Sequence, residues 1–154
     1  FTRRPATSPA LRPDFLPRLN NNLTRHRRAA DTTEDIIHYA YRALFTGTAR
    51  DPLVYELAHR NDRALRELFG SDILGLTMLS LEDDVREAMA RGLLPQIDHE
   101  YLCAAFFGVA YETSLTLARR AHRNPDSAEA EALTATRFST ALFMGGLPRL
   151  AALP

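Results

Sequence analysis

The sequence predicts an all-α fold, an antiparallel helical bundle whose last two long helices form a dimeric four-helix interface. Apolar residues recur at helical spacing from residue 31 onward, and no segment alternates apolar and polar residues as a half-buried strand does. The two long helical segments near the C-terminus are separated only by Asn124 and Pro125, so we expect them to form an antiparallel hairpin. The first of them carries no charge over residues 101–111, which favours burial of that surface.

The composition is typical of a soluble globular protein. The 154 residues are 45% apolar and 25% charged, which predicts one domain large enough to bury its own core. No apolar run approaches the ~20 residues that span a bilayer, and the sequence starts without a signal-peptide pattern, so no membrane association is expected. The single cysteine, Cys103, excludes an intrachain disulfide framework and agrees with a reducing compartment. We therefore expect a cytoplasmic protein.

The charge divides the chain into two parts. Residues 1–30 hold seven arginines and one acid, a net +6, so the remaining 124 residues carry 12 arginines against 18 acids, a net −6. A proline at every fourth position from Pro5 to Pro17 blocks a continuous helix there. We interpret residues 1–30 as a basic arm or linker and 31–154 as a helical ligand-binding and dimerisation domain. The arm could bind phosphates, lie on an acidic body or remain solvated.

Three helices are expected in the first half of this domain. The run "DTTEDIIHYAYRALFTG" offers N-cap residues and early acids at its start and a glycine, Gly47, at its end. Asp51 is placed to cap a short helix that begins with Pro52 and ends near Asn61. Residues 62–70 predict another short amphipathic helix that ends at a glycine.

Three longer helices follow. Residues 71–92 place apolar side chains on one face and charged ones on the other. Asp98 is a strong N-cap for the next helix, which extends to about Arg123, and Ile97 and Leu102 stand at the staple positions on either side of the cap. The final helix is expected over about 125–144, closed by a double glycine, with one apolar stripe made of Ala128, Ala132, Ala135, Phe138 and Leu142.

The uncharged surface of residues 101–111 predicts a homodimer. Ala104, Ala105 and Gly108 form a strip of small residues where another helix backbone could approach closely, at a cost of about 1 kcal/mol in helix propensity at the glycine. The simplest partner is the same hairpin of a second copy, which completes a four-helix bundle. The alternative is the central helix of a monomer. The residues expected at the dimer interface are Ala104, Ala105, Gly108, Leu115, Ala135, Phe138 and Leu142.

Catalytic and metal-binding signatures are not found in the sequence. The histidines have no metal-ligand spacing, and although residues 98–100 read Asp-His-Glu, adjacent helical residues diverge. Cys103 lies among small apolar residues and reads as a buried hydrophobe. No nucleophile elbow, phosphate-binding loop or dinucleotide-binding fingerprint occurs. We expect no enzyme activity, no cofactor and no metal.

An aromatic-rich middle section could instead line an apolar cavity between helices, with a few polar groups to orient a ligand. Most of these residues are also suited to an ordinary core. Glu112 is the most informative, because a carboxylate at the end of an apolar face needs water, a partner or a ligand. The candidate ligand-binding residues are Tyr41, Phe45, Tyr55, His59, Phe69, Met78, Phe107, Tyr111 and Glu112.

The runs "LEDDVREAMARGLLPQIDHEYLCAAFFGVAYE" and "NPDSAEAEALTATRFSTALFMGGLPRL" resemble the C-terminal effector-binding and dimerisation domain of TetR/AcrR-family transcriptional regulators. In that family an amphipathic helix ends in an arginine-glycine pair and leads through a loop with proline and aspartate into two long antiparallel helices, the second ending near a double glycine. The matching residues here are Arg91-Gly92, Pro95, Asp98 and Gly145-Gly146.

The resemblance implies a homodimer and a cavity, in the helices before the hairpin, for a small effector that controls DNA binding. The DNA-binding helix-turn-helix head of the family has no counterpart in this chain, since residues 1–30 are too rich in proline to form it. DNA binding is therefore expected only through a head that this chain lacks. The alternative is a stand-alone helical module that binds a small molecule or a protein and does not bind DNA.

Overall fold

The structure, a computed structural model, describes residues 31–61 and 73–154, with the backbone alone for Ala58 and for 73–80. Across these residues the chain forms helices and connections and no strand, so the predicted all-α class is confirmed. The expected helix over 62–70 lies outside the described residues. The elements in order are α2 (Thr33–Arg50), α3 (Pro52–Arg60), α5 (Ile73–Ala90), α6 (His99–Arg123), the short 3-10 helix η2 (Pro125–Ser127) and α7 (Ala128–Ala151).

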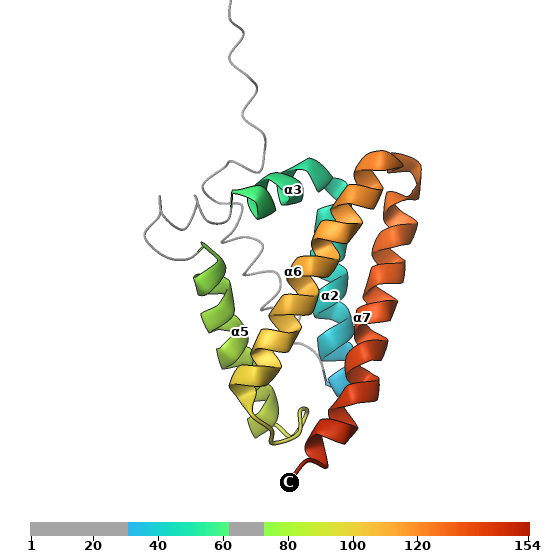
Figure 1. Ribbon diagram of the computed structural model, residues 1–154. Coiled ribbons are helices and arrows are strands. Elements are labelled where there is room, and N and C mark those ends of the chain that lie inside the picture. Colours follow the sequence, from blue (N-terminus) through green and yellow to red (C-terminus); the bar gives the residue numbers. More distant parts are fainter. Residues whose placement is uncertain (1–30, 62–72) are drawn as a thin grey trace, which may run out of the picture.

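The helices pack around α6. Figure 1 shows α6 and α7 running antiparallel, joined by a tight turn, with α2 packed behind both. α5 lies along the opposite side of α6 from α7, and α3 crosses near the end of α6 that leads into the turn. The antiparallel hairpin expected of the last two helices is therefore present, and α2 completes a core of three long helices.

A cluster of aromatic side chains joins these three helices at the centre of the core. The Tyr41 hydroxyl on α2 donates a hydrogen bond of 2.9 Å to the carbonyl of Phe106 on α6. The ring of Phe143 on α7 lies 4.3 Å from that of Phe106 and 6.0 Å from that of Tyr41, measured between centroids. The Phe45 ring stacks on Tyr41 at 5.4 Å. Since all four residues are buried, they fix the spacing of α2, α6 and α7.

Side-chain caps confirm two of the predicted helix starts, those of α2 and α6, whereas Asp51 occupies the N-cap position of α3 without such a bond. The Thr32 side chain accepts a hydrogen bond of 3.1 Å from the Asp35 amide at the start of α2. The Asp98 carboxylate accepts two, from the amides of Glu100 at 3.0 Å and Tyr101 at 3.1 Å. Each cap satisfies amides that the helix itself leaves without an acceptor. The predicted staple is consistent with this start, because both of its side chains belong to the core.

Removing the α6 cap should have a measurable effect. We expect Asp98→Ala to lower the free energy of unfolding by about 1 kcal/mol, because two amides lose their acceptor. The matched control is Asp51→Ala, since Asp51 occupies the N-cap position of α3 without a side-chain capping bond. Urea unfolding followed by circular dichroism measures both variants. Equal effects of the two substitutions would contradict the role given to the Asp98 carboxylate.

The connection between α5 and α6 begins with a glycine-terminated helix end. Gly92 has φ +74°, and its amide donates to the carbonyl of Met89 while the Leu93 amide donates to that of Ala88. This pair of bonds is the Schellman pattern, which favours glycine at the left-handed position. The Thr33 hydroxyl donates to the Leu93 carbonyl and so joins the start of α2 to the same connection.

The predicted end of the first helix is wrong, because α2 continues through Gly47 to Arg50. Thr48, one residue beyond the glycine, is fully buried and donates a hydrogen bond of 2.9 Å to the Leu44 carbonyl. A methyl group added at Gly47 would lie 3.4 Å from the Tyr55 hydroxyl oxygen. The glycine thus permits close approach of α3, and tertiary packing offsets its low helix propensity.

The predicted end of the last helix is also wrong. α7 passes through Gly145, Gly146 and Pro148 and ends at Ala151. Leu147 is buried in the core, so the residues after the double glycine are held in the helix by packing. Each glycine costs about 1 kcal/mol of helix propensity, which burial of one large apolar side chain can offset.

The buried face of α7 differs from the predicted apolar stripe. Ala132 is buried as expected, but Phe138 and Leu142 are 64% and 50% exposed. The buried positions are instead mostly small hydroxyl residues together with two large apolar ones: Thr136, Ser139, Thr140, Phe143 and Leu147. The two threonine hydroxyls donate to backbone carbonyls four residues earlier, at 2.8 and 2.7 Å, so they can be buried without losing hydrogen bonds.

Candidate functional site

Four of the candidate ligand-binding residues lie together where α3 packs on α6. We call His59 of α3 with Phe107, Tyr111 and Glu112 of α6 the α3–α6 cluster. The His59 and Tyr111 rings stack with centroids 4.4 Å apart, and the Phe107 and Tyr111 rings lie 5.9 Å apart at an interplanar angle of 15°. The His59 Nε2 atom is 3.6 Å from the Glu112 carboxylate. The cluster therefore combines three ring systems with one carboxylate.

Tyr55 anchors α3 beside this cluster. Its hydroxyl is buried next to Gly47 of α2. Burial raises the pKa of Tyr55 to about 12, hydrogen bonding to Thr48 lowers it less, and the negative charge of Asp51 raises it further. Tyr55 therefore stays neutral at physiological pH and holds α3 in contact with the end of α2.

Stability should fall at alkaline pH because of Tyr55 and Tyr41. Burial also raises the pKa of Tyr41 above the ordinary tyrosine value of 10.0. A folded-state pKa above the unfolded one gives stability that is complete below pH 10 and is lost as pH rises, by about 1.4 kcal/mol per pH unit for each tyrosine. Urea unfolding from pH 9 to pH 11.5 should show this loss, and Tyr55→Phe should reduce its slope. Tyr101→Phe, at a 79% exposed position, should leave the slope unchanged; equal slopes in all three proteins would contradict the assignment.

The remaining ligand-binding candidates are placed elsewhere. Tyr41 and Phe45 belong to the packed centre of the bundle described above. Phe69 lies outside the described residues, and Met78 lies on α5 where only the backbone is described. The structure thus brings four of the nine candidates into one cluster, with Tyr55 beside them.

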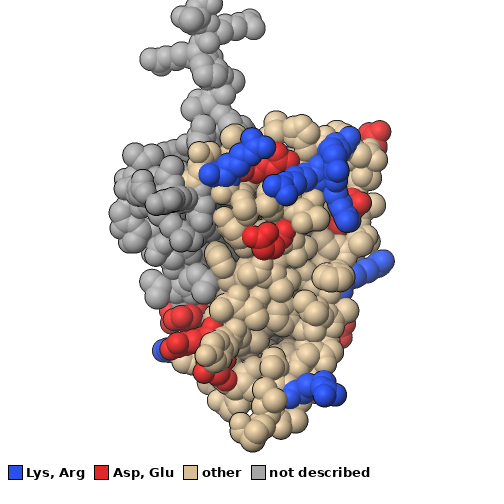
Figure 2. Space-filling view, in the orientation of Figure 1, with Lys and Arg blue, Asp and Glu red and all other residues tan. Residues whose placement is uncertain are grey.

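A second notable surface is the outer side of the hairpin. Tyr101, Ala104, Ala105 and Gly108 on α6 are exposed, and a methyl group added at Gly108 would meet no described residue within 4 Å. With the exposed Phe138 and Leu142 of α7, these residues are named the exposed α6–α7 face. In Figure 2 the side of the molecule formed by α6 and α7 is largely free of charged side chains away from the α6–α7 turn.

Two of the expected interface residues are not on this face. Leu115 is buried within the chain, and Ala135 is half-buried against the core. Their apolar surface is mostly covered by their own chain, which leaves little of it for a partner. The other five, Ala104, Ala105, Gly108, Phe138 and Leu142, are all exposed.

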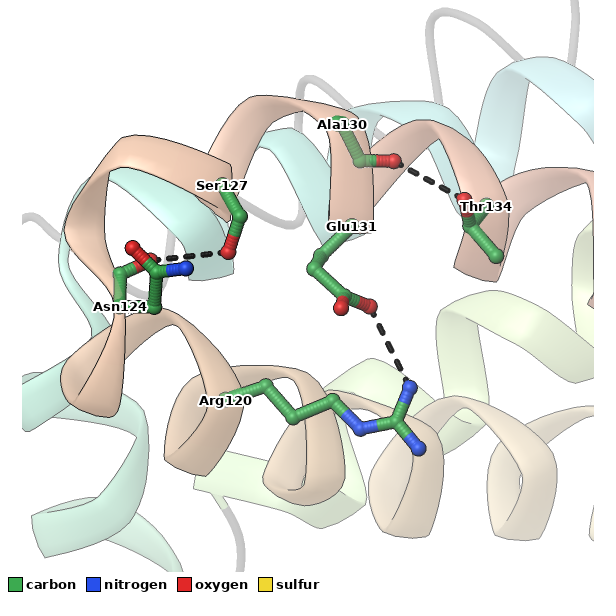
Figure 3. A network of polar contacts seen from close by, with 6 residues as sticks. All are labelled: Arg120, Asn124, Ser127, Ala130, Glu131 and Thr134. Atoms are coloured by element: carbon green, nitrogen blue, oxygen red, sulfur yellow. Dashed lines mark hydrogen bonds and ion pairs between the residues drawn. The ribbon is translucent and has the colours of Figure 1, made fainter.

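Polar contacts hold the two helices of the hairpin at their turn. Arg120 on α6 pairs with Glu131 on α7 at 3.3 Å, and the Ser127 hydroxyl donates a bond of 3.0 Å to the Asn124 carbonyl (Figure 3). The ion pair is partly exposed, so it contributes at most about 1 kcal/mol. Its position joins α6 to α7 close to the turn between them.

Sequence reasoning missed the pairing of several polar groups. Arg86 lies 3.0 Å from His99 Nε2, which must act as the acceptor because an arginine can only donate. The hydroxyls of Ser114 and Ser139 are buried and have no hydrogen-bond partner among the residues that the structure describes. The residue types were visible in the sequence, but their neighbours are set by helix packing, which no local signal records.

The described residues were compared with the requirements of a metal site and of a membrane-spanning helix. Over residues 31–61 and 73–154, no group of three or more histidine, cysteine, aspartate or glutamate side chains could hold a metal ion. α6 is long and apolar enough to cross a membrane, with 33% of its most apolar window buried inside the chain. A single helix of this kind is weak evidence, because core helices of globular proteins pass the same test.

Comparison with known proteins identifies no relative. No family model matches the chain, and neither curated proteins nor solved structures give a match. The α3–α6 cluster and the exposed α6–α7 face are therefore the features from which a function can be inferred.

Proposed function

We propose that this chain is the ligand-sensing and homodimerisation portion of a bacterial TetR-like transcriptional regulator. The observation that carries the proposal is the antiparallel α6–α7 hairpin with its exposed, uncharged side. A small apolar or amphipathic effector binds among the helices that precede the hairpin, and it controls DNA binding by a helix-turn-helix head that this chain does not contain. The resemblance of residues 81–112 and 124–150 to that family supports the same function.

The exposed α6–α7 face supports the dimer. Phe138 at 64% and Leu142 at 50% exposure leave large apolar surface in water, and the small residues Ala104, Ala105 and Gly108 of α6 are exposed as well. Burial of apolar surface contributes roughly 25 cal/mol per Å², so covering this face is favourable. A second hairpin related by a two-fold axis buries the same face on both copies and completes a four-helix bundle.

The α3–α6 cluster supports the effector site. It lies on the helices that precede and begin the hairpin, so an effector bound there contacts both α3 and the dimerising helix α6. Aromatic rings with one charged group are the usual lining of a small-molecule site. Movement of α3 relative to α6 would then change the arrangement of the helices that lead away from the dimer interface.

Sedimentation velocity tests the dimer directly. At micromolar concentration we expect a single species of twice the 17.3 kDa chain mass. Native mass spectrometry of the same sample should show release of a small bound molecule on activation of the complex. A monomer at all accessible concentrations would overturn the proposed function.

The competing function is the stand-alone helical module that binds a small molecule or protein without DNA. Both functions allow a dimer and a ligand, so sedimentation does not separate them. The encoded sequence upstream of Phe1 does. A helix-turn-helix there supports the regulator, and an open reading frame that starts without one supports the module.

A further inference from the structure

The chemical class of the effector can be inferred from the α3–α6 cluster. Its only acid is Glu112, whose side chain is 71% exposed. The 3.6 Å between its carboxylate and His59 Nε2 is too long for a hydrogen bond, and the buried Nε2 atom has no hydrogen-bond partner among the described residues. An ionised carboxylate can accept about four hydrogen bonds, so Glu112 retains capacity for a donor from outside the chain.

The aromatic rings beside Glu112 extend the site along α6. Phe107 and Tyr111 are one helical turn apart, and their rings are within 15° of parallel. Both side chains are half-buried, so part of their surface is open beside the carboxylate. The His59 ring covers Tyr111 from α3. The cluster thus offers an apolar aromatic surface with a negative group at one end.

A cation is favoured over an anion or a neutral group at this place. The carboxylate attracts a positive charge, and the faces of aromatic rings attract it as well. An anion is repelled by the same carboxylate, and a neutral group gains from neither interaction. An apolar body attached to the cation would bury itself against the rings.

We propose that the α3–α6 cluster binds the positively charged group of a cationic, aromatic or amphipathic effector. The charge lies against Glu112 and beside the rings of Tyr111 and Phe107. This inference rests on the proposed effector-binding function and names the class of molecule that the site selects.

Three probes of similar shape and different charge test the selection. Tetraphenylphosphonium is the cation, tetraphenylborate the anion and triphenylphosphine oxide the neutral compound. Isothermal titration calorimetry of the full chain in sodium buffer measures their binding. We expect the cation to bind at least about ten-fold more tightly than the anion, a difference of about 1.4 kcal/mol.

Variants of Glu112 assign the preference to this site. Glu112→Gln should weaken binding of the cation about ten-fold and leave binding of the neutral probe nearly unchanged. Glu112→Lys should reverse the preference, so that the anion binds more tightly than the cation. The control is Glu100→Gln, because Glu100 is an exposed acid in the first turn of the same helix. Circular dichroism and thermal unfolding verify that all variants keep the fold.

The outcomes separate this inference from the proposed function. Selective binding of the cation that is lost in Glu112→Gln and kept in Glu100→Gln supports it. Equal binding of cation and anion, or equal effects of the two glutamine variants, overturns the charge selection while effector binding stands. Failure of all three probes to bind overturns both the inference and the effector part of the proposed function.

Discussion

Replacing Phe143 by alanine is expected to lower the free energy of unfolding by about 3–5 kcal/mol, the usual cost of truncating a buried phenylalanine. Its ring lies 4.3 Å from that of Phe106 and 6.0 Å from that of Tyr41, so it fills the space where α2, α6 and α7 meet. The cavity left behind cannot collapse easily, because the Tyr41 hydroxyl is fixed by its bond to the Phe106 carbonyl. Urea unfolding measures the change.

Phe138→Ala is the matched control on the same helix. Phe138 is 64% exposed, so its truncation should cost the isolated chain less than about 1 kcal/mol. Because the proposed dimerisation would add to apparent stability, both variants should be measured over a range of protein concentrations. Phe138→Ala should mainly weaken the concentration dependence, whereas Phe143→Ala should destabilise at every concentration. If the two substitutions cost the same at high dilution, the assignment of Phe143 to the core is wrong.

Helix starts could be predicted from the sequence, but two helix ends could not. A cap is local, because Thr32 and Asp98 bond to amides two or three residues away. A glycine ends a helix only when packing does not hold the residues after it in the helix. Thr48 beyond Gly47 and Leu147 beyond Gly146 are both buried, and the packing that holds them comes from distant parts of the chain. The ends of α2 and α7 therefore depend on contacts between distant residues, which the sequence pattern does not reveal.

The sequence could predict which types of residue form the candidate sites, but it could not predict which of these residues lie next to one another. Phe138 and Phe143 are both apolar residues on α7, and the stripe predicted from helical spacing included the exposed Phe138 and omitted the buried Phe143. The buried face was not recognised because it also contains Thr136, Ser139 and Thr140, and the two threonine hydroxyls can be buried because they bond to carbonyls within the helix. Similarly, His59 and Tyr111 were separate candidates, and only the packing of α3 on α6 makes them a stacked pair.

Gly108→Arg is expected to abolish the proposed dimer while leaving the chain folded. A side chain at this position meets nothing within 4 Å, so the isolated chain can accommodate arginine, and helix propensity should improve by about 1 kcal/mol. At a two-fold interface the change appears twice, and each arginine fills the small-residue strip and places an unpaired charge against apolar surface. We expect the dissociation constant to rise at least about 100-fold, equivalent to about 2.8 kcal/mol.

Sedimentation velocity and circular dichroism together decide the result for Gly108→Arg. The expected outcome is a monomer with an unchanged helical spectrum and cooperative unfolding. Asp83→Arg provides the control, since Asp83 is exposed on α5, which is not part of the hairpin, and the variant should sediment like the parent chain. A Gly108→Arg protein that remains a dimer would place the interface on another surface, because an arginine there could not be buried between two hairpins without a partner. The dimer contact would then have to be sought outside the exposed α6–α7 face.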